Sequence, residues 1–388
     1  MSSLQGGPRR FPLRTPRFWG LVGLLVFLAW VISHRPVVEH IGLVLLDSAI
    51  GAQDDTPTDQ LSTALILMTP DDRRELYGQR DSVFPQDLYA LLEAADSAGA
   101  AVLAVDLLTH AKQYATTTPP STRAPIVWSY GADAQTGDFL PPLGGRSDGP
   151  ERAGLSIGVL DRDWRLRRYH PYWERPGFEP IPGFIRAIVD AWCTVTIRRD
   201  LRGCSGAGPD STTARIFLSR RSLTVAAVSA RELLVSYRER SLRPEAWQRS
   251  RSALLGRAVI LGATGTVDAH STGQGVVPGV LIVARGVESE LRRSYILDMG
   301  EPTAMLLKVV LAVLIGLMFH YSSIGWATLL MGGLVGLTVF LGYNPALLRG
   351  YWLNAVPLLI GFWIEHVVEG YLAQRHREAE RDGPRGSS

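Results

Sequence analysis

The sequence predicts an extracytoplasmic α/β domain with a mixed, largely parallel sheet, plus four transmembrane α-helices, one before the domain and three after it. Three observations support this fold class. Long uncharged apolar runs stand at both ends of the 388-residue chain. Between them, short apolar runs alternate with segments of helical periodicity, which is typical of parallel strands joined by crossover helices. The polar middle of the chain, residues 34–303, is long enough to bury its own core.

The first predicted transmembrane helix covers residues 18–33. Residues 18–32 are all apolar or Gly, and residues 1–17 form a basic N-terminus with Arg9, Arg10, Arg14 and Arg17. A cleaved signal peptide is the alternative, but no small-residue cleavage motif follows the run. We therefore expect an uncleaved anchor, which an amphipathic helix over residues 37–46 would extend.

Three further apolar segments predict the C-terminal transmembrane helices, because each is too long for a buried strand. They cover residues 304–320, 323–342 and 351–368, before a tail of residues 369–388. Arg residues flank the first and the last helix, so both termini are expected in the cytoplasm of a bacterial cell, with the lipid bilayer of the inner membrane as a partner. Gly332 and Gly336 form a small-xxx-small pair, which would let helices pack closely and would allow a homo-dimer.

Composition and cysteine content narrow the function classes. The net charge of +3 shows no bias toward a polyanionic partner, so we expect no nucleic acid, and no motif indicates a cofactor. Cys193 and Cys204 are the two cysteines of the chain. An oxidising compartment would allow them to form a disulfide; two unpaired thiols are the alternative.

Within the predicted domain, the first part of the chain indicates a strand, helix, strand unit. Residues 61–68 form a short apolar run typical of a central strand. Residues 85–98 carry leucines at helical spacing, and residues 101–105 form a second buried strand. Residues 115–147 are expected to form a loop that contains one strand near residues 125–128.

The second part of the domain begins with a predicted hairpin. Residues 156–160 and 166–169 flank the turn Asp161-Arg162-Asp163-Trp164, which is expected to be polar and exposed. A helix over residues 184–192 and a basic, Gly-rich insertion over residues 196–213 follow.

The end of the domain contains the clearest local patterns. Ser229 and Glu232 form a capping box at the start of a helix. An Arg-rich loop is expected after it, then a buried strand at residues 257–262. Pro278 and Gly279 are predicted to begin the last helix of the domain.

The order of these motifs resembles the second class of the CHASE-type family, extracytoplasmic sensory domains associated with bacterial cyclases and histidine kinases. Residues 255–264, followed by Asp268 and by Pro278-Gly279, are similar to the closing strand, Gly-rich turn and helix start of that family. Residues 100–107 resemble its strand that ends in an apolar-Asp-apolar step. Residues 161–168 resemble its Asp-x-Asp-Gly-x-x-Arg-Arg turn, but Trp164 stands where the family has Gly.

Two further motifs of the family are partly present. Asp71 and Asp72 occupy the place of its paired acids, and Phe84-Pro85 is what is left of an aromatic-Pro motif. The resemblance covers residues 21–368. It implies a sensory domain that signals inward, and because residues 369–388 are too few for an output module, it also implies a separate partner protein.

Four residues are the candidate ligand-binding site: Asp106, Thr264, Asp268 and His270. They follow predicted parallel strands, and ligands of open α/β sheets bind at the carboxyl ends of strands. If the two strands are neighbours, Asp106 and Asp268 could bind a cation, an amine or sugar hydroxyls beside the pH-sensitive His270. The alternative is that these acids cap turns and pair with Arg. Neither zinc nor a nucleotide is expected, because ligand spacing and a helix directly after the Gly-rich turn are missing.

The function predicted from these observations is that of a membrane-anchored sensor that binds a small ligand, or detects the state of the cell envelope, and signals to another protein. The alternative is a structural or docking subunit without a ligand, for which an exposed apolar patch is expected in place of a concave site. No motif of hydrolases is present, so no catalytic activity and no catalytic residue are predicted; an extracytoplasmic enzyme is a third alternative.

Overall fold

The computed structural model divides the chain into two compact units, one of residues Ile50–Leu297 and one of Met1–Ala49 with Asp298–Ser388. In the first unit it describes residues 61–77, 83–132, 139–145, 152–174, 179–195, 225–265, 268–272 and 275–297, together with 50, 51, 204, 215 and 216. In the second unit it describes residues 35–49 and scattered positions in 23–31 and 298–360. The two units are considered separately below.

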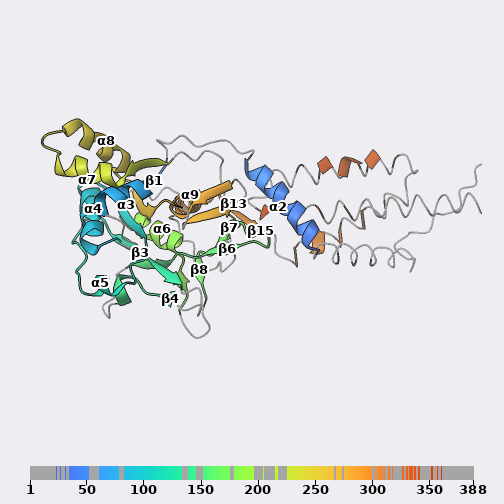
Figure 1. The fold of residues 1–388 in the computed structure, drawn as a ribbon. Helices are drawn as coiled ribbons and strands as arrows, with labels where there is room; N and C mark the ends of the chain where they lie inside the picture. The colour runs from blue at the N-terminus through green and yellow to red at the C-terminus, as the bar shows by residue number, and fades with distance from the viewer. Residues whose placement is uncertain are drawn as a thin grey trace, which may run out of the picture. The chain divides into compact units, whose positions relative to one another are not determined.

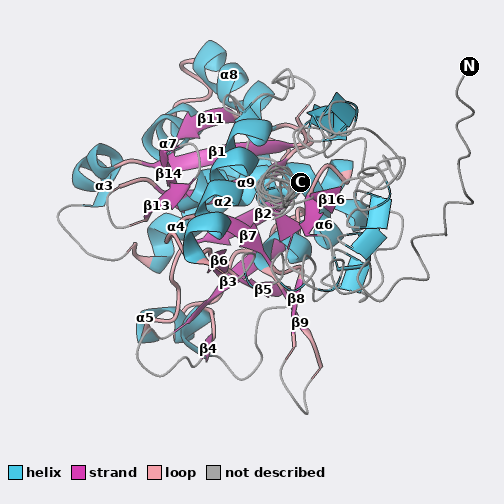
Figure 2. Cartoon of the chain, turned by 90° about the vertical axis from the view of Figure 1, so that its right-hand side faces the viewer, coloured by secondary structure: helices cyan, strands magenta, loops and turns pink. Residues whose placement is uncertain are grey.

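A largely parallel sheet forms the centre of the unit Ile50–Leu297 (Figures 1 and 2). Its order is β11-β1-β12-β2-β3-β4, and β5 also pairs with β3. All of these pairs are parallel except β3 with β4, as the sequence predicted. The strands are β1 (Thr63–Met68), β2 (Val102–Asp106), β3 (Ile126–Ala132), β4 (Phe139–Leu140), β5 (Ala153–Leu155), β11 (Ala226–Ser229) and β12 (Ala258–Ala263).

Helices cover both faces of this sheet. On one face, α4 (Pro85–Ser97), α7 (Ala230–Arg238) and α8 (Pro244–Leu254) bury leucines against the strands. On the other face, α6 (Phe184–Val195) and α9 (Gly279–Arg292) pack against the strands and against each other. Two faces covered by helices explain why β1, β2 and β12 are continuous apolar runs.

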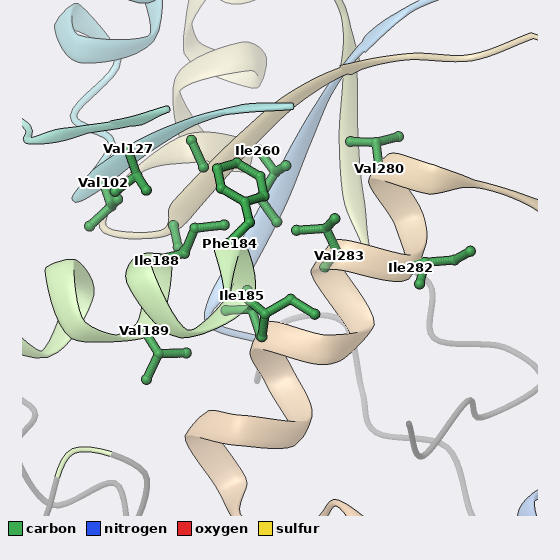
Figure 3. Packing of buried hydrophobic residues seen from close by; sticks show 14 of the residues in the cluster. Val102, Val127, Phe184, Ile185, Ile188, Val189, Ile260, Val280, Ile282 and Val283 are labelled. Carbon is green, nitrogen blue, oxygen red and sulfur yellow. The ribbon is translucent and has the colours of Figure 1, made fainter. Parts of the chain in front are cut away.

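The core under α6 and α9 connects the helices to the middle of the sheet. Phe184 and Ile188 of α6 point toward Val102, Val127 and Ile260 on three strands (Figure 3). All of these side chains are buried. Burial of an aliphatic or aromatic side chain contributes about 1.5–3 kcal/mol, so this layer is a principal source of stability.

Smaller elements surround the sheet. The strands β15 (Ile296–Asp298), β10 (Arg215–Ile216), β7 (Leu166–Tyr169) and β6 (Gly158–Leu160) are neighbours in that order in a second sheet. Two hairpins pair β13 (Ala269–Thr272) with β14 (Gly275–Pro278), and β8 (Tyr172–Trp173) with β9 (Ile181–Pro182). The remaining elements are α3 (Pro70–Tyr77), α5 (Lys112–Ala115), η3 (Leu143–Gly145), α2 (Pro36–Gly51) and β16 (Tyr351–Trp352).

Local sequence patterns explain where several helices begin. The predicted cap of α7 is confirmed, because the Glu232 amide donates to the Ser229 hydroxyl at 3.0 Å. A second cap was not predicted: the Thr69 amide and hydroxyl both donate to the Asp72 carboxylate before α3, at 2.9 and 2.8 Å. The paired acids Asp71 and Asp72 thus differ in role, since Asp71 is an exposed partner of Arg74.

The turn between β6 and β7 is less exposed than predicted. Asp161 and Arg167 are buried, and Arg167 Nη1 lies 3.0 Å from Asp161 Oδ2 and 2.8 Å from Asp163 Oδ1. The hydrogen bonds from Arg167 hold the pKa of Asp163 below its ordinary value. Asp161 and Asp163 also pair with Arg168 and Arg165, so two acids and three arginines form a compact ionic turn. A hydrogen-bonded charge pair can be buried where a lone charge cannot.

The Arg-rich loop expected after α7 is mostly the helix α8. Pro244 stands in its first turn, Ser250 and Leu254 are buried, and arginines cover the exposed side. We predicted a loop because the segment is rich in Arg. Arg is, however, a good helix former, and Pro is favourable at the first helical position.

The predicted membrane part of the fold needs correction. Among the helices that the structure describes, none combines the length and the apolar character needed to cross a bilayer. The prediction of four transmembrane helices is therefore wrong; it rested on hydropathy, which is necessary for a span but does not itself establish a continuous helix of about 20 residues. Most residues of the four segments 18–33, 304–320, 323–342 and 351–368 lie outside the described residues.

Two smaller predictions concern the unit formed by the chain ends. The expected helix over residues 37–46 is present as α2, which is 16 residues long. Gly332 and Gly336 are helical, but a Cβ added at either would meet no described atom within 4 Å. Helix packing at these two glycines stays a prediction.

The disulfide is confirmed. Cys193 near the end of α6 is bonded to Cys204, with a Cα–Cα distance of 5.4 Å. The bridge ties the segment after α6 to the helix and closes a loop with a sequence separation of 11.

Candidate functional site

The candidate site begins where two central strands end side by side. Asp106 is the last residue of β2 and pairs with Gly262 of β12, so the two strands are neighbours. The open carboxyl ends of adjacent parallel strands are where α/β sheets bind ligands. Gly262 has no side chain because a Cβ there would lie 2.6 Å from Val280 of α9.

The hairpin β13-β14 then brings Asp268 to the start of α9. The Gly279 amide donates to the Asp268 carbonyl at 2.9 Å, which closes the base of the hairpin. A Cβ at Gly279 would lie 2.7 Å from Asp268 Oδ1, so the Asp268 carboxylate packs directly against the first residue of the helix. A negative charge is favourable at this end of a helix.

His270 completes the acidic group. Its Nε2 atom lies 3.5 Å from Asp268 Oδ1, and both side chains are partly exposed. The hydrogen bond that the imidazole donates to the Asp268 carboxylate is the main cause that raises the pKa of His270 above its ordinary value, and the charge of Asp106 adds to the effect. The imidazole is therefore charged over a wider pH range than a free histidine.

The pKa of Asp106 is the most strongly shifted in this group. Burial, and then repulsion from Asp268, raise the pKa of Asp106 to about 6, while a hydrogen bond from Ser156 Oγ at 3.0 Å opposes the rise. The side chain keeps part of its surface open to solvent, but protein atoms crowd it on most sides. A carboxyl group with such a pKa changes charge near neutral pH.

These residues line a cavity of about 300 Å³. Asp106, Asp268 and His270 all contribute to its wall, so the structure brings three of the four candidate residues together. This volume is at the lower end of small-molecule sites. The apolar part of the wall includes Leu155, Ile157, Leu166, Phe184, Ile185, Ile282 and Val283.

Thr264 does not belong to the cavity. Its amide donates to the Met68 carbonyl at 3.0 Å and extends the pairing of β12 with β1, away from the cavity wall. The prediction included it because it follows β12, but the cavity is lined by Asp268 and His270 further along the chain.

Several cavity residues were not predicted from the sequence. Ser129, Tyr130 and Ser156 come from or follow β3 and β5, and Tyr169 and His170 come from the end of β7. Gly183 lies beside them, and a Cβ there would lie 2.3 Å from the His170 carbonyl oxygen. No pattern in the sequence shows that these segments meet.

Tyr169 of the cavity wall is hydrogen-bonded to a buried carboxylate of α9. The Tyr169 hydroxyl donates to Glu290 Oε1 at 2.8 Å, and Arg186 Nη1 of α6 lies 3.8 Å from Glu290 Oε2. Two residues earlier on the helix, Glu288 Oε1 accepts from the amide and the hydroxyl of Thr63 at the start of β1. The helix α9 therefore joins the cavity wall to β7, α6 and β1 through its own side chains.

Comparison with known proteins agrees with this architecture. The sequence matches the CHASE2 domain over residues 21–334. Neither the search of curated proteins nor the search of solved structures gave a match. The matched range includes every strand of the central sheet and every residue of the acidic group. The chain therefore belongs to the CHASE2 domain family, whose members are extracellular sensory domains.

Proposed function

We propose that this protein is a sensor that binds a small ligand in the cavity beside Asp106 and signals its occupancy to a separate partner protein. The observation that carries the proposal is the cavity itself, which brings Asp106, Asp268 and His270 together at the carboxyl ends of β2 and β12. The sensory character of the family supports the same conclusion.

A location outside the cytoplasm is part of this proposal. The disulfide Cys193–Cys204 supports it, because disulfides persist in oxidising compartments and are rare in the cytosol. Family membership supports it as well, since CHASE2 domains are extracellular.

The helix α9 is the element we propose for signal transmission. Its first turn lines the cavity with Gly279, Ile282 and Val283. Its second half carries the buried carboxylates Glu288 and Glu290, and the chain then continues into β15. A ligand that moves the start of α9 would therefore change the contacts at its far end, because a helix moves as a rigid element.

The docking alternative differs from this proposal in the surface that it needs. A docking subunit would use an exposed apolar patch, whereas a sensor needs a concave site with a few polar groups. The cavity is a concave site with a few polar groups, which come from β2, β13 and the segment after β5.

An enzymatic alternative rests on one contact, the hydrogen bond from Ser156 to Asp106. In a hydrolase a histidine commonly accepts the hydrogen bond of the serine, but the Ser156 hydroxyl donates to the Asp106 carboxylate. We propose binding without catalysis. Replacing Ser156 with Ala separates the two alternatives, because it would abolish turnover by a serine enzyme but only weaken one hydrogen bond in a binding site.

The direct test is a thermal-shift screen of the purified full-length chain against amines, sugars, carboxylates, nucleosides and amino acids. We expect one of these classes to raise the Tm, and we expect Ile157→Trp, which adds bulk to the cavity wall, to remove the rise. Val159→Trp on the adjacent strand β6 is the matched control, since Val159 is not in the wall. The proposal is wrong if no class binds, or if binding is the same in both variants.

A further inference from the structure

The charges of the cavity wall discriminate between classes of ligand. Asp106 and Asp268 contribute carboxylates, and the described wall residues include neither Lys nor Arg. His270 offsets part of the charge of Asp268, because the two side chains form an ion pair when the imidazole is protonated. The hydrogen-bond donor to Asp106 is the neutral hydroxyl of Ser156. His170 and His270 are the basic side chains among the described wall residues. The wall therefore favours a positive charge next to Asp106.

The N-termini of two helices in the wall favour a negatively charged ligand instead. Phe184 and Gly279 begin α6 and α9, and a helix N-terminus carries about half a positive charge. The start of α9 is already faced by the carboxylate of Asp268, which packs against Gly279. Full carboxylate charges outweigh the remaining partial charge at α6, so an anion is disfavoured.

The apolar residues of the wall indicate that the ligand is not a bare metal cation. Leu155, Phe184, Ile185, Ile282 and Val283 form an apolar side, and Phe184, Ile185 and Val283 lie where α6 meets α9 (Figure 3). Among the described residues, no three His, Cys, Asp or Glu side chains gather as a metal site would need. An apolar surface contributes to binding only when the ligand has apolar atoms to place against it.

We propose, on the basis of the ligand-sensing function above, that the ligand is a small organic ammonium ion. Its charged nitrogen lies next to Asp106 and Asp268, and its apolar body lies against Phe184 and Val283. Tyr130 and Tyr169 add aromatic faces to the wall, and such faces attract organic cations.

The test uses three matched probe sets with the full-length chain. Each set contains an ammonium ion, the alcohol that replaces the amine with a hydroxyl, and the carboxylate of similar size, built on butyl, cyclohexyl and 2-phenylethyl bodies. Binding is measured by saturation-transfer NMR and by titration calorimetry at pH 7.5. We expect binding of ammonium members, with the alcohols and carboxylates at least about 10-fold weaker.

Variants locate the bound probe. Asp106→Asn and Asp268→Asn should each weaken ammonium binding by about 10-fold to 100-fold, because hydrogen bonds to charged groups are the strong ones. Asp71→Asn is the control, since Asp71 is an exposed acid on α3 that lies outside the cavity wall. An equal effect of all three variants would indicate a general charge effect and would contradict the assignment.

The outcomes also separate this inference from the proposed function. If alcohols or carboxylates bind in a manner that Ile157→Trp prevents, the cavity is a ligand site but the ammonium assignment is wrong. If ammonium probes do not bind, the assignment is wrong irrespective of other ligands.

Discussion

At the scale of single residues, Trp164 adopts a backbone conformation that suits glycine. Its φ is +60°, its side chain is 78% exposed, and its amide closes the turn by donating to the Asp161 carbonyl at 2.9 Å. The left-handed region costs an L-residue about 1–2 kcal/mol. The exposed indole gains little from burial in return. This is also the position at which the resembled turn motif carries Gly.

We therefore expect Trp164→Gly to stabilise the protein by about 1 kcal/mol, after the entropy that glycine adds to the unfolded chain is subtracted. Urea unfolding followed by circular dichroism would measure the difference. Trp164→Ala is the control, since alanine keeps the cost of the positive φ. Equal stability of the Gly and Ala variants would show that the backbone is not strained at this turn.

Asp106 predicts a pH dependence of stability. Its pKa in the folded protein, about 6, lies above the ordinary value of 3.8, so the folded state binds the proton more tightly than the unfolded state. Stability therefore falls as pH rises from about 4 to about 6 and stays lower above that range. The raised pKa of His270 acts in the same direction, because its contribution is lost as pH rises through that pKa.

Replacing Asp106 with Asn should remove the first of these effects. The variant keeps an oxygen that accepts from Ser156 but loses the charge, so we expect it to be more stable than the wild type by about 1–3 kcal/mol at pH 8. The advantage should shrink steadily below pH 6. Thermal unfolding at half-unit pH steps from 5 to 8 measures both curves, and parallel curves would contradict the role given to Asp106.

At the scale of elements, the contact between β12 and α9 depends on the absence of one side chain. A Cβ at Gly262 would lie 2.6 Å from both Cβ and Cγ2 of Val280, closer than real atoms approach. Because Gly262 pairs with Asp106, a displaced α9 would also change the cavity. We expect Gly262→Ala to destabilise the protein by about 1–3 kcal/mol.

A glycine just after β12 serves as the comparison. Gly265 is exposed and a Cβ there would meet Pro70 at 3.9 Å, an ordinary contact. Gly265→Ala should change the free energy of unfolding by less than about 0.5 kcal/mol. Similar losses in the two variants would mean that the turn, and not the contact with α9, accounts for the effect.

The sequence predicted elements better than it predicted the site. Apolar runs identified β1, β2 and β12 because strands buried on both faces need apolar residues throughout, and Ser229 identified the start of α7. Short strands such as β8 and β13 were missed because two to four residues carry no measurable periodicity. Asp106, Asp268 and His270 were found from the rule about strand ends. Ser156 and Tyr169 were not, since their closeness depends on tertiary packing.

At the scale of the whole molecule, the disulfide constrains a long segment next to the core helix α6. Loss of a bridge that closes a loop of this size costs about 2–3 kcal/mol. Cys193→Ser and Cys204→Ser should therefore each lower the free energy of unfolding by that amount, and the double variant should lose no more than either. Additive losses would mean that each cysteine is stabilised by its own packing and not by the bridge.

The same bridge tests the proposed compartment. Cells that produce the full chain are quenched with acid, and free thiols are then alkylated with a large maleimide. We expect the wild-type chain to remain unmodified unless a reductant is added first, because the bridge forms in an oxidising compartment. Complete modification without a reductant would contradict a location outside the cytoplasm.

The position of β12 between β1 and β2 has a consequence for synthesis of the protein. Both neighbours leave the ribosome more than 150 residues before β12, as residues 63–68 and 102–106 precede residues 258–263. Until then each has an unpaired edge, and such edges are prone to aggregation. Chains that terminate before residue 258 should therefore fold poorly and depend on chaperones. Longer chains contain β12 and can complete the sheet in one late step.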